Sequence, residues 1–339
     1  MSQADLEGTA EVRDALVRMG LVPRGEAPIF ERLTGGVSSD IWKVEVAGHP
    51  AFCVKRALAQ LRVSQEWKAP VERNGYEIAW METAAAVVPD AVPRILGVDQ
   101  AAGLFAMEYL DPGVYALWKR QLRDGIASTH SARLASRALV SIHEATAGKL
   151  DVAERFPTDA IFHAIRLEPY LIATGRRHPE LADALNALAE STARTKRTLV
   201  HGDVSPKNIL IGPKGPVFLD AECAWYGDPA FDVAFCLNHF LLKCLWTPRA
   251  VPKFLACYDS FAKEYFDRVT WESPLELEAR TARLLPGLFL ARVDGKSPVE
   301  YITEEADRER VRRVAAPLLR QPPQRLTAIR DAWRKELTA

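Results

Sequence analysis

A change of hydrophobic pattern near residue 111 most constrains the fold of this 339-residue chain. Before it, short apolar runs alternate with glycine and proline breakers, whereas after it long helical periodicities dominate. The turn signal Asp111-Pro112-Gly113 separates the two patterns. A sheet-rich segment followed by a helical one is typical of α+β proteins. We therefore expect an N-terminal lobe over residues 1–110 and a larger helical C-terminal lobe over residues 111–339.

The first lobe is predicted to hold an antiparallel sheet, because its apolar runs are short and separated by turn signals. Its expected elements are a helix at 11–20, strands at 29–33, 40–46, 51–57 and 103–109, and a helix at 73–86. In the second lobe, helices are expected at 131–147, 179–192, 229–246, 248–265, 275–290 and 304–320, with a surface helix after 322. One compact strand–loop–strand passage, residues 198–221, interrupts these helices.

The charge balance limits the classes of partner. The 44 basic and 44 acidic side chains cancel, whereas nucleic-acid and anionic-membrane binding favour a basic excess. The most apolar segment, 234–246, is too short to cross a bilayer and is interrupted by Asn238, His239 and Lys243. The N-terminus lacks the pattern of a secretory signal, and the five cysteines form no CxxC pair. These features predict a cytoplasmic protein with reduced thiols and without nucleic-acid or membrane partners. They do not determine the oligomeric state, for which both a monomer and a homodimer are expected alternatives.

The passage 198–221 carries the clearest chemistry. An apolar strand leads into His201-Gly202-Asp203, Asn208 follows five positions after the aspartate, and the next apolar strand ends at Asp220. Phosphoryl transfer needs a base at the attacking hydroxyl and metal ligands that hold the phosphates of the nucleotide. Asp203 would accept or orient the hydroxyl proton. The oxygens of Asn208 and Asp220 are hard ligands suited to Mg²⁺, and His201 is expected to brace the loop.

Two other interpretations of this passage were weighed. It could be a hairpin with incidental polar residues, but the flanking apolar strands and Gly202 argue against chance. It could also bind zinc, but His201 has no second histidine or cysteine at ligand spacing. The spacing therefore favours a catalytic loop.

The same residues carry a family resemblance. The sequence resembles the aminoglycoside phosphotransferase and choline kinase family at three successive groups of residues. These are His201-Gly202-Asp203 with Asn208, then Asp220-Ala221-Glu222, then Gly227-Asp228-Pro229 with Asp232. The resemblance is sharp over residues 199–232. It implies a two-lobed protein-kinase-like fold and an enzyme that uses ATP and Mg²⁺ to phosphorylate a hydroxyl of a small molecule. It also implies that Asp232 hydrogen-bonds the catalytic loop from beneath.

The resemblance places the nucleotide in the first lobe. Lys55, in Phe52-Cys53-Val54-Lys55, is similar to the strand lysine that contacts phosphates in kinases. Such a lysine needs an acidic partner on the following helix. Glu77 is the preferred partner, because family members place this glutamate one helix ahead of a segment like Val92-Pro93-Arg94-Ile95-Leu96. Glu66 and Glu72 remain alternatives.

Two further segments are expected to contact the nucleotide. Residues 34–40, Thr-Gly-Gly-Val-Ser-Ser-Asp, would cover the phosphates with backbone N–H groups and the hydroxyls of Ser38 and Ser39. This loop departs from G-x-G-x-x-G. The segment 107–110 lies where the family has its inter-lobe hinge, so the backbone at Glu108 and Leu110 would contact the adenine edge.

The acceptor is expected to be small, because Gly227-Asp228-Pro229 follows Glu222 too closely to leave room for the activation loop of a protein kinase. Lys207, Arg166 and Arg292 fall where the family builds its substrate wall, and converging cations would suit a carboxylate or phosphate. They could equally be exposed surface charges. A hydroxylated metabolite with an anionic group is preferred, and an amino alcohol or aminoglycoside is the alternative.

Two non-kinase hypotheses were also considered. A pseudokinase usually lacks the base, the metal-binding aspartate or the lysine, but Asp203, Asp220 and Lys55 are all present. A phosphohydrolase with Asp203 as nucleophile would leave Asn208 and Lys55 without a role.

Overall fold

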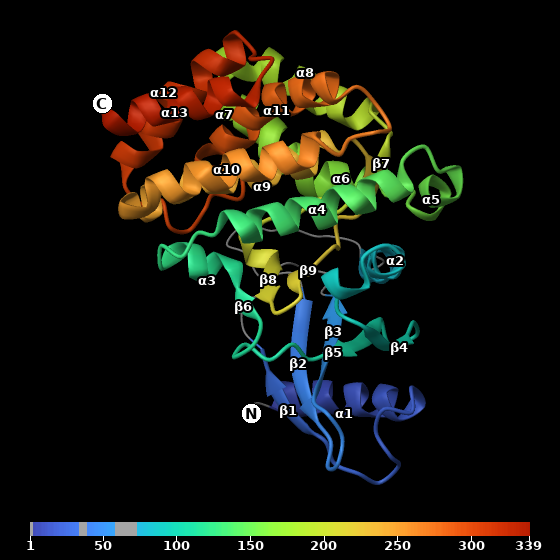
Figure 1. Ribbon diagram of the computed structural model, residues 1–339. Helices are drawn as coiled ribbons and strands as arrows, with labels where there is room; N and C mark the ends of the chain where they lie inside the picture. Colours follow the sequence, from blue (N-terminus) through green and yellow to red (C-terminus); the bar gives the residue numbers. More distant parts are fainter. Residues whose placement is uncertain (1–2, 34–38, 58–72) are drawn as a thin grey trace. The chain divides into compact units, whose positions relative to one another are not determined.

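The computed structural model describes residues 3–33, 39–57 and 73–339 and divides the chain into two compact units, Met1–Asp111 and Pro112–Ala339 (Figure 1). Ser38 and the alternatives Glu66 and Glu72 lie outside the described residues. Within the described ranges, no helix is both long enough and apolar enough to cross a membrane. The five cysteines are buried and free.

The first unit is built on a five-stranded antiparallel sheet with the strand order β1-β2-β3-β5-β4. Its strands are β1 (Ile29–Arg32), β2 (Ser39–Glu45), β3 (Phe52–Ala57), β4 (Ile95–Asp99) and β5 (Leu104–Glu108). In the central strand β3, Lys55 lies opposite Ile41 of β2 and Phe105 of β5. Four of these strands and α2 (Arg73–Ala85) confirm the predicted elements, whereas β4 was not predicted.

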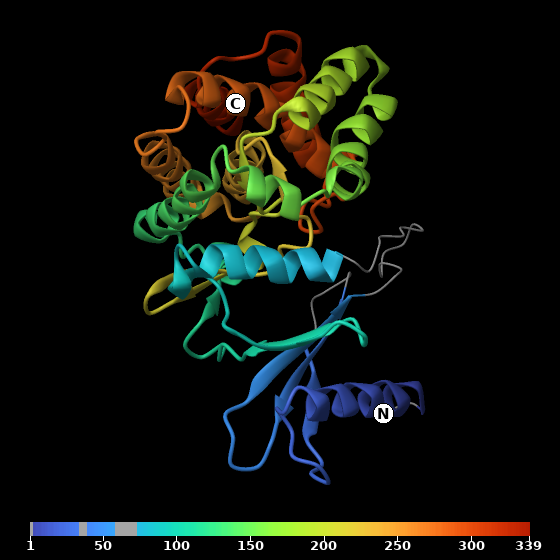
Figure 2. The same cartoon turned by 90° about the vertical axis from the view of Figure 1, so that its right-hand side faces the viewer.

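Each face of this sheet carries one helix. Helix α1 (Gln3–Arg18) lies against the strands of this sheet (Figure 2). Its side chains Val12, Ala15 and Leu16 pack into a buried cluster that includes Val54 of β3. Because side chains alternate along a strand, the neighbouring Lys55 points to the opposite face. There it meets Glu77 of α2.

The second unit is mainly helical and contains two small sheets. One sheet has three strands, β6 (Ala116–Leu117), β8 (Ile209–Gly212) and β9 (Gly215–Phe218). The other has two strands, β7 (Thr198–Val200) and β10 (Trp225–Gly227). The helices are α3 (Trp118–Arg123), α4 (Thr129–Thr146), α5 (Leu150–Arg155), α6 (Asp159–Phe162), α7 (Ala173–Arg177), α8 (Ala182–Arg194), α9 (Ala230–Trp246), α10 (Val251–Phe266), α11 (Pro274–Asp294), α12 (Glu305–Arg320) and α13 (Leu326–Thr338). Helices α4 and α10 lie side by side, and α9 packs against α10 and α11 (Figure 1).

Helix α9 is buried almost throughout, as expected of a helix that is apolar on all sides. Its buried polar residues include Asp232, His239 and Lys243. At 3.6 residues per turn, positions seven and eleven residues after Asp232 return to the same face of the helix. One stripe of this buried helix is therefore polar.

The segment between the predicted helices at 131–147 and 179–192 contains a helix that the sequence did not predict. Residues His163–Ile172 form a π-helix that includes Pro169. Proline in a helix interior removes a backbone donor and argues against a regular α-helix here. The wider turn tolerates it, and the carbonyl of Pro169 accepts a hydrogen bond from the backbone N–H of Lys296 at 2.9 Å. π-Helical turns are rare and are frequent near functional sites.

A buried carboxylate fixes the end of α11. Both oxygens of Asp294 accept from Arg312, at 2.7 and 2.8 Å, and one of them lies 2.7 Å from His178 Nε2. Arg177 lies 3.2 Å away. Burial opposes ionisation, but these partners outweigh it and hold the pKa of Asp294 below its ordinary value. The ion pair with Arg312 thereby anchors α12 to the end of α11.

We predict that Asp294→Asn lowers the free energy of unfolding at pH 7 by about 2 kcal/mol, because the buried acceptor of Arg312 and Arg177 loses its charge. A carboxyl with a lowered folded-state pKa stabilises the protein above its unfolded pKa, near 4, and loses this effect as the pH falls. Urea unfolding at several pH values should therefore show the difference shrinking below about pH 4. Glu309→Gln, at a half-exposed partner of Arg312, is the control. Equal stability of Asp294→Asn and wild type at pH 7 would contradict this account.

Candidate active site

The loop after β7 is held by a carboxylate from α9. The backbone N–H groups of His201 and Gly202 donate to Asp232, at 2.7 and 2.8 Å. His143 Nε2 lies 3.2 Å from the same carboxylate, and its Nδ1 lies 2.6 Å from the hydroxyl of Tyr265. This network assigns Nε2 as the donor and Nδ1 as the acceptor for Tyr265. The expected contact of Asp232 with the loop is confirmed.

Gly202 is required by the path of this loop. Its φ is +78°, and a Cβ atom placed there would lie 2.6 Å from the carbonyl oxygen of Cys223. Both the left-handed conformation and the close approach exclude a larger residue. His201, which precedes it, is buried, and its Nδ1 accepts from the backbone N–H of Asp203 at 3.2 Å. This geometry matches the bracing role expected of His201.

Asp203 lies between two cations. Its Oδ2 is 2.9 Å from Arg166 Nη2 and 3.1 Å from Lys207 Nζ. Burial opposes ionisation of Asp203, but Lys207 and Arg166 outweigh it and hold the pKa of the carboxyl well below its ordinary value. The second oxygen, Oδ1, is buried and has no hydrogen-bond partner in the part of the chain that the structure describes. An ionised oxygen is thus left available to a donor.

The hairpin β8–β9 places Asn208 and Asp220 at one end of the same pair of strands. Ile209 pairs with Phe218, and the backbone N–H of Leu219 donates to the carbonyl of Asn208 at 2.8 Å. Asn208 precedes the first strand, and Asp220 follows the second by two residues. The amide Nδ2 of Asn208 donates to the carbonyl of Asp203 at 3.2 Å, which connects the hairpin to the loop.

Asp220 has an uncommon backbone conformation. Its φ is +66°, and no other non-glycine residue in the described part of the chain has a positive φ. Such residues cost free energy and cluster at functional sites. The charge of Asp220 acts on both Lys207 and His201, as does that of Asp203. The two carboxylates therefore share the same surroundings.

The donor set at this end of the hairpin suits a hard divalent cation, because it offers one amide and one carboxylate. Across the described residues, no group of three or more His, Cys, Asp or Glu side chains is arranged to hold a metal ion by itself. A cation held here would therefore need ligands from a bound molecule as well, as is usual for Mg²⁺ with phosphates.

In the first unit, Lys55 and Glu77 form a buried ion pair. The distances from Lys55 Nζ to Oε1 and Oε2 of Glu77 are 2.8 and 2.7 Å, and both side chains are almost fully inaccessible. Glu77, the preferred one of the three acidic candidates, is thus the residue that pairs with Lys55 in the part of the chain that the structure describes. A buried ion pair is weak evidence for stability, so this pair points to a functional role.

Two other nucleotide candidates lie in the same unit. The hydroxyl of Ser39 is buried and has no hydrogen-bond partner among the described residues. The backbone N–H of Glu108, the last residue of β5, donates to the carbonyl of Arg94 at 2.9 Å. A ligand could then use the carbonyl of Glu108 but not its N–H. Leu110 follows two residues later, and its contact with a nucleotide stays a prediction.

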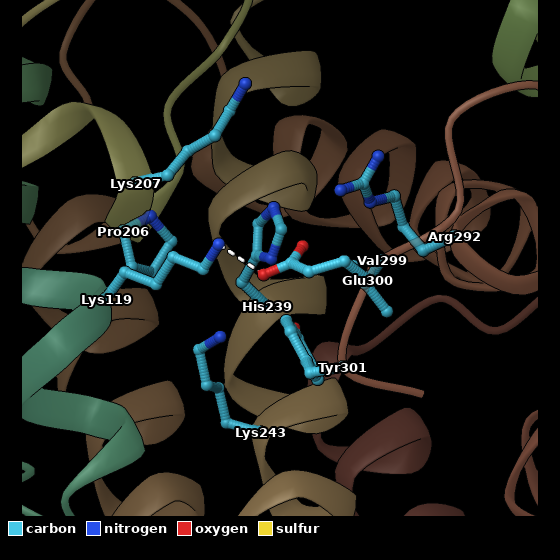
Figure 3. Close-up of a pocket in the computed structure, with 9 residues that line it drawn as sticks. All are labelled: Lys119, Pro206, Lys207, His239, Lys243, Arg292, Val299, Glu300 and Tyr301. Atoms are coloured by element: carbon cyan, nitrogen blue, oxygen red, sulfur yellow. Dashed lines mark ion pairs between the residues drawn. The ribbon is translucent and has the colours of Figure 1, made fainter. Parts of the chain in front are cut away.

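The second unit contains a cationic pocket, which we call the α9 pocket. It is lined by Lys119, Pro206, Lys207, His239, Lys243, Arg292, Val299, Glu300 and Tyr301 (Figure 3). Lys207 and Arg292, both expected near the substrate, therefore share one pocket. Arg166 does not line it: in addition to Asp203, it donates to the carbonyls of Gly202 and Ile165. The structure gives Arg166 a positioning role, and its contact with a substrate stays a prediction.

Sequence reasoning missed His239, Lys243, Lys119 and Tyr301 as pocket residues. The sequence did contain an indication of a polar site on this helix. His239 and Lys243 are four residues apart in an otherwise apolar helix, so they share a face. They were considered only as interruptions of an apolar segment.

The comparisons with known proteins fit this site. A family model described as "Phosphotransferase enzyme family" matches residues 29–256. The chain belongs to this family, and the family recognised from the sequence is confirmed. Methylthioribose kinase 2 of Oryza sativa subsp. japonica is 24% identical over 223 residues, covering 57% of this chain and 51% of the relative. Methylthioribose kinase of Escherichia coli O45:K1 is 26% identical over 260 residues, covering 63% and 60%. The chain thus spans about half to 60% of the length of these relatives.

Solved structures confirm the fold class. A choline/ethanolamine kinase family protein from Mesorhizobium loti superposes with a TM-score of 0.51 and 15% identity, covering 96% of this chain and 99% of the other. An amicoumacin kinase, solved with AMP-PNP, Ca²⁺ and Ami, gives a TM-score of 0.56 at 11% identity, covering 96% and 98%. At these identities the likeness shows the fold alone. The predicted α+β kinase-like fold is confirmed.

We predict that Asp232→Ala destabilises the protein by about 3 kcal/mol or more, because two buried N–H groups lose their charged acceptor. Hydrogen exchange should show faster exchange at the amides of His201 and Gly202 than in wild type. Asp259→Asn, at a half-exposed aspartate of α10, is the control and should leave both amides protected. Unchanged protection in Asp232→Ala would show that another contact holds the loop.

Proposed function

We propose that this chain is an ATP- and Mg²⁺-dependent phosphotransferase that moves the γ-phosphate to a hydroxyl group of a small molecule. The observation that carries the proposal is the ionised Asp203 on the loop that also presents Asn208, with Asp220 at the same end of the adjoining hairpin. Membership of the phosphotransferase enzyme family supports the same reaction class.

In this proposal, Asp203 orients the acceptor. Its unpartnered Oδ1 would accept a hydrogen bond from the acceptor hydroxyl, while Oδ2 stays with Arg166 and Lys207. The two cations make the carboxylate a weak base. A weak base suffices where the transition state is loose, since positioning then matters more than early proton removal. Arg166, through Gly202 and Asp203, keeps the loop in place.

The chain offers suitable groups for the nucleotide and the metal. Asn208 Oδ1 and the carboxylate of Asp220 would hold Mg²⁺, because Nδ2 of Asn208 is occupied by the carbonyl of Asp203. When bound, Mg²⁺ neutralises charge on the phosphates. In the first unit, Lys55, oriented by Glu77, would contact the phosphates.

Further nucleotide contacts in this proposal come from the same unit. The hydroxyls of Ser39 and of Ser38 would donate to the phosphates. The backbone at Glu108 and Leu110 would contact the adenine. The two units thereby take the nucleotide-binding and the catalytic and substrate-binding roles expected of residues 1–110 and 111–339.

Two observations support a small acceptor. Only β10 and short turns separate Asp220 from α9, so no long loop intervenes to bind or regulate a protein substrate. The relatives include methylthioribose kinases, whose name gives a small sugar derivative. The cations around Asp203 and in the α9 pocket favour an acceptor with an anionic group over an amino alcohol or aminoglycoside.

We predict that Asp203→Asn lowers kcat for phosphoryl transfer about 10²–10⁴-fold, because the acceptor hydroxyl loses its orienting carboxylate. The affinity for ATP should change little. Mg²⁺-dependent ATP turnover, measured with acceptors identified by screening, provides the readout. Asp151→Asn, at an exposed aspartate of α5, is the control. Equal turnover by Asp203→Asn and wild type would favour a non-catalytic nucleotide-binding protein.

The Lys55–Glu77 pair allows a double-mutant test. Lys55→Met and Glu77→Gln should each reduce kcat/KM for ATP, and the double variant should lose much less than the product of the two effects, because both act through one interaction. Steady-state kinetics with ATP varied gives the three values. Fully additive effects would show that the pair does not act as a unit on the nucleotide.

A further inference from the structure

The α9 pocket is a small hollow inside the helical unit, partly open to solvent. Its walls come from α3, from the turn at Pro206 and Lys207, from α9 and α11, and from the chain after α11 (Figure 3). The cations that line it outnumber its single carboxylate, that of Glu300.

The ion pairs leave two of these cations without an acid. Lys119 pairs with Glu300, and Lys207 pairs with Asp203. Neither Arg292 nor Lys243 has a carboxylate within ion-pair distance in the described part of the chain. Lys243 is 1% exposed, and its Nζ lies over the rings of Tyr301 and Trp246, at 3.8 and 4.2 Å from their centres. Ring faces offset part of the cost of burying a cation but do not replace an anion.

Three polar atoms of the pocket are also buried without partners among the described residues. They are Arg292 Nε, His239 Nε2 and the hydroxyl of Tyr301. Arg292 is held in place, because its Nη1 donates to Tyr170 at 3.2 Å and to Ser297 Oγ at 3.1 Å. Buried polar groups are normally satisfied, and a cluster that is not points to a missing ligand. Arg292 Nε can only donate, and the hydroxyl of Tyr301 can donate as well, so one acceptor would satisfy both. An acceptor with a negative charge also suits Arg292 and the charged form of Lys243.

We propose that the α9 pocket binds the anionic group, a carboxylate or a phosphate, of the molecule that is phosphorylated. This inference rests on the proposed function and names the acceptor class and the residues that select it. Lys207 connects the two sites, because it contacts Asp203 and also lines the pocket. An acceptor with its hydroxyl at Asp203 can therefore extend into the pocket, where Arg292, Lys243 and Tyr301 contact its anion.

Binding of the anion is coupled to a proton. Burial lowers the pKa of Lys243 well below its ordinary value; Lys119 and Arg292 lower it further, and Glu300 opposes them. Burial, Arg292 and Lys243 lower the pKa of the neighbouring His239 in the same way. A bound anion opposes these effects and raises the pKa of Lys243, so binding takes up a proton at any pH at which the free protein holds Lys243 neutral. In that pH range, affinity falls as the pH rises through the pKa of the complex.

In this proposal, Lys243 lowers the stability of the ligand-free wild-type protein. A buried lysine without an acid is destabilising whether its amino group is charged or neutral, and an apolar residue of similar length avoids the cost of desolvating that group. Lys243→Met should therefore raise the melting temperature in the absence of ligand while it weakens anion binding. Opposite effects on stability and binding separate a binding role from a structural one, because a structural lysine would lose stability when replaced.

The first experiment measures anion binding to the full chain without nucleotide. Acetate and inorganic phosphate are titrated at constant ionic strength, with calorimetry and thermal unfolding as readouts. We expect Lys243→Met and Arg292→Gln to weaken binding of at least one ion about 10–100-fold, the loss of one charge-assisted hydrogen bond. Lys263→Met on α10 and Arg283→Gln on α11 are the matched controls outside the pocket and should bind like wild type.

The two ions distinguish the two ligand chemistries. Pocket-dependent binding of acetate indicates a carboxylate, and that of phosphate indicates a phosphate group. Calorimetry in two buffers of different ionisation enthalpy should show proton uptake in wild type and less in Lys243→Met. Equal responses of wild type and all variants, as general salt stabilisation would give, overturn the proposal.

A second experiment separates failure of this inference from failure of the proposed function. Alcohols that carry a carboxylate, a phosphate, no charge or an ammonium are compared as acceptors, with glycerate, glycerol 3-phosphate, glycerol and 3-amino-1,2-propanediol as the matched set. Transfer only to neutral or cationic alcohols overturns the anion site and leaves the kinase proposal standing. Pocket-dependent anion binding without any transfer of phosphate supports the anion site and counts against the kinase proposal.

Discussion

Two backbone N–H groups of the catalytic loop, those of His201 and Gly202, donate to the buried carboxylate of Asp232. This carboxylate lies at the start of α9, the helix that is buried almost throughout. The loop therefore takes its position from the core of the helical unit rather than from its own turns. The same face of α9 carries His239 and Lys243 about two and three turns further on. One rigid helix thus sets the places of both the catalytic loop and the cationic pocket.

The buried charges of the protein are arranged for chemistry at some cost in stability. Three sets of ionisable side chains are nearly inaccessible to solvent: the Lys55–Glu77 pair, the Arg166–Asp203 pair and Lys243, which has no acidic partner among the described residues. Apolar residues of similar volume are often at least as stabilising at such positions. Natural proteins break local rules mainly at functional sites and compensate elsewhere. Around the charges of the helical unit, α9 packs its apolar side chains against α10 and α11. In the proposed function, these groups hold the phosphates of the nucleotide and the hydroxyl and anion of the acceptor.

The sequence predicted the sheet, most of the long helices and the loop of Asp203, because each depends on short-range patterns that a single segment contains. The choice of Glu77 over Glu66 and Glu72 drew on the resemblance, since spacing alone does not decide which carboxylate reaches Lys55. The π-helix was missed because Pro169 has the pattern of a breaker. The α9 pocket was missed because its residues come from segments as distant as Lys119 and Tyr301. His239 and Lys243 gave a local signal, but only the fold shows what they face.

The central claim is that Asn208 and Asp220 hold the metal while Asp203 stays free for the acceptor. A crystal structure with Mg²⁺ and a non-hydrolysable ATP analogue tests it most directly. The account predicts electron density for the ion within about 2.0–2.1 Å of Asn208 Oδ1 and an oxygen of Asp220. It also predicts Asp203 uncoordinated, with Oδ1 facing the γ-phosphate. A metal bound through Asp203, or held without Asn208 and Asp220, would contradict it.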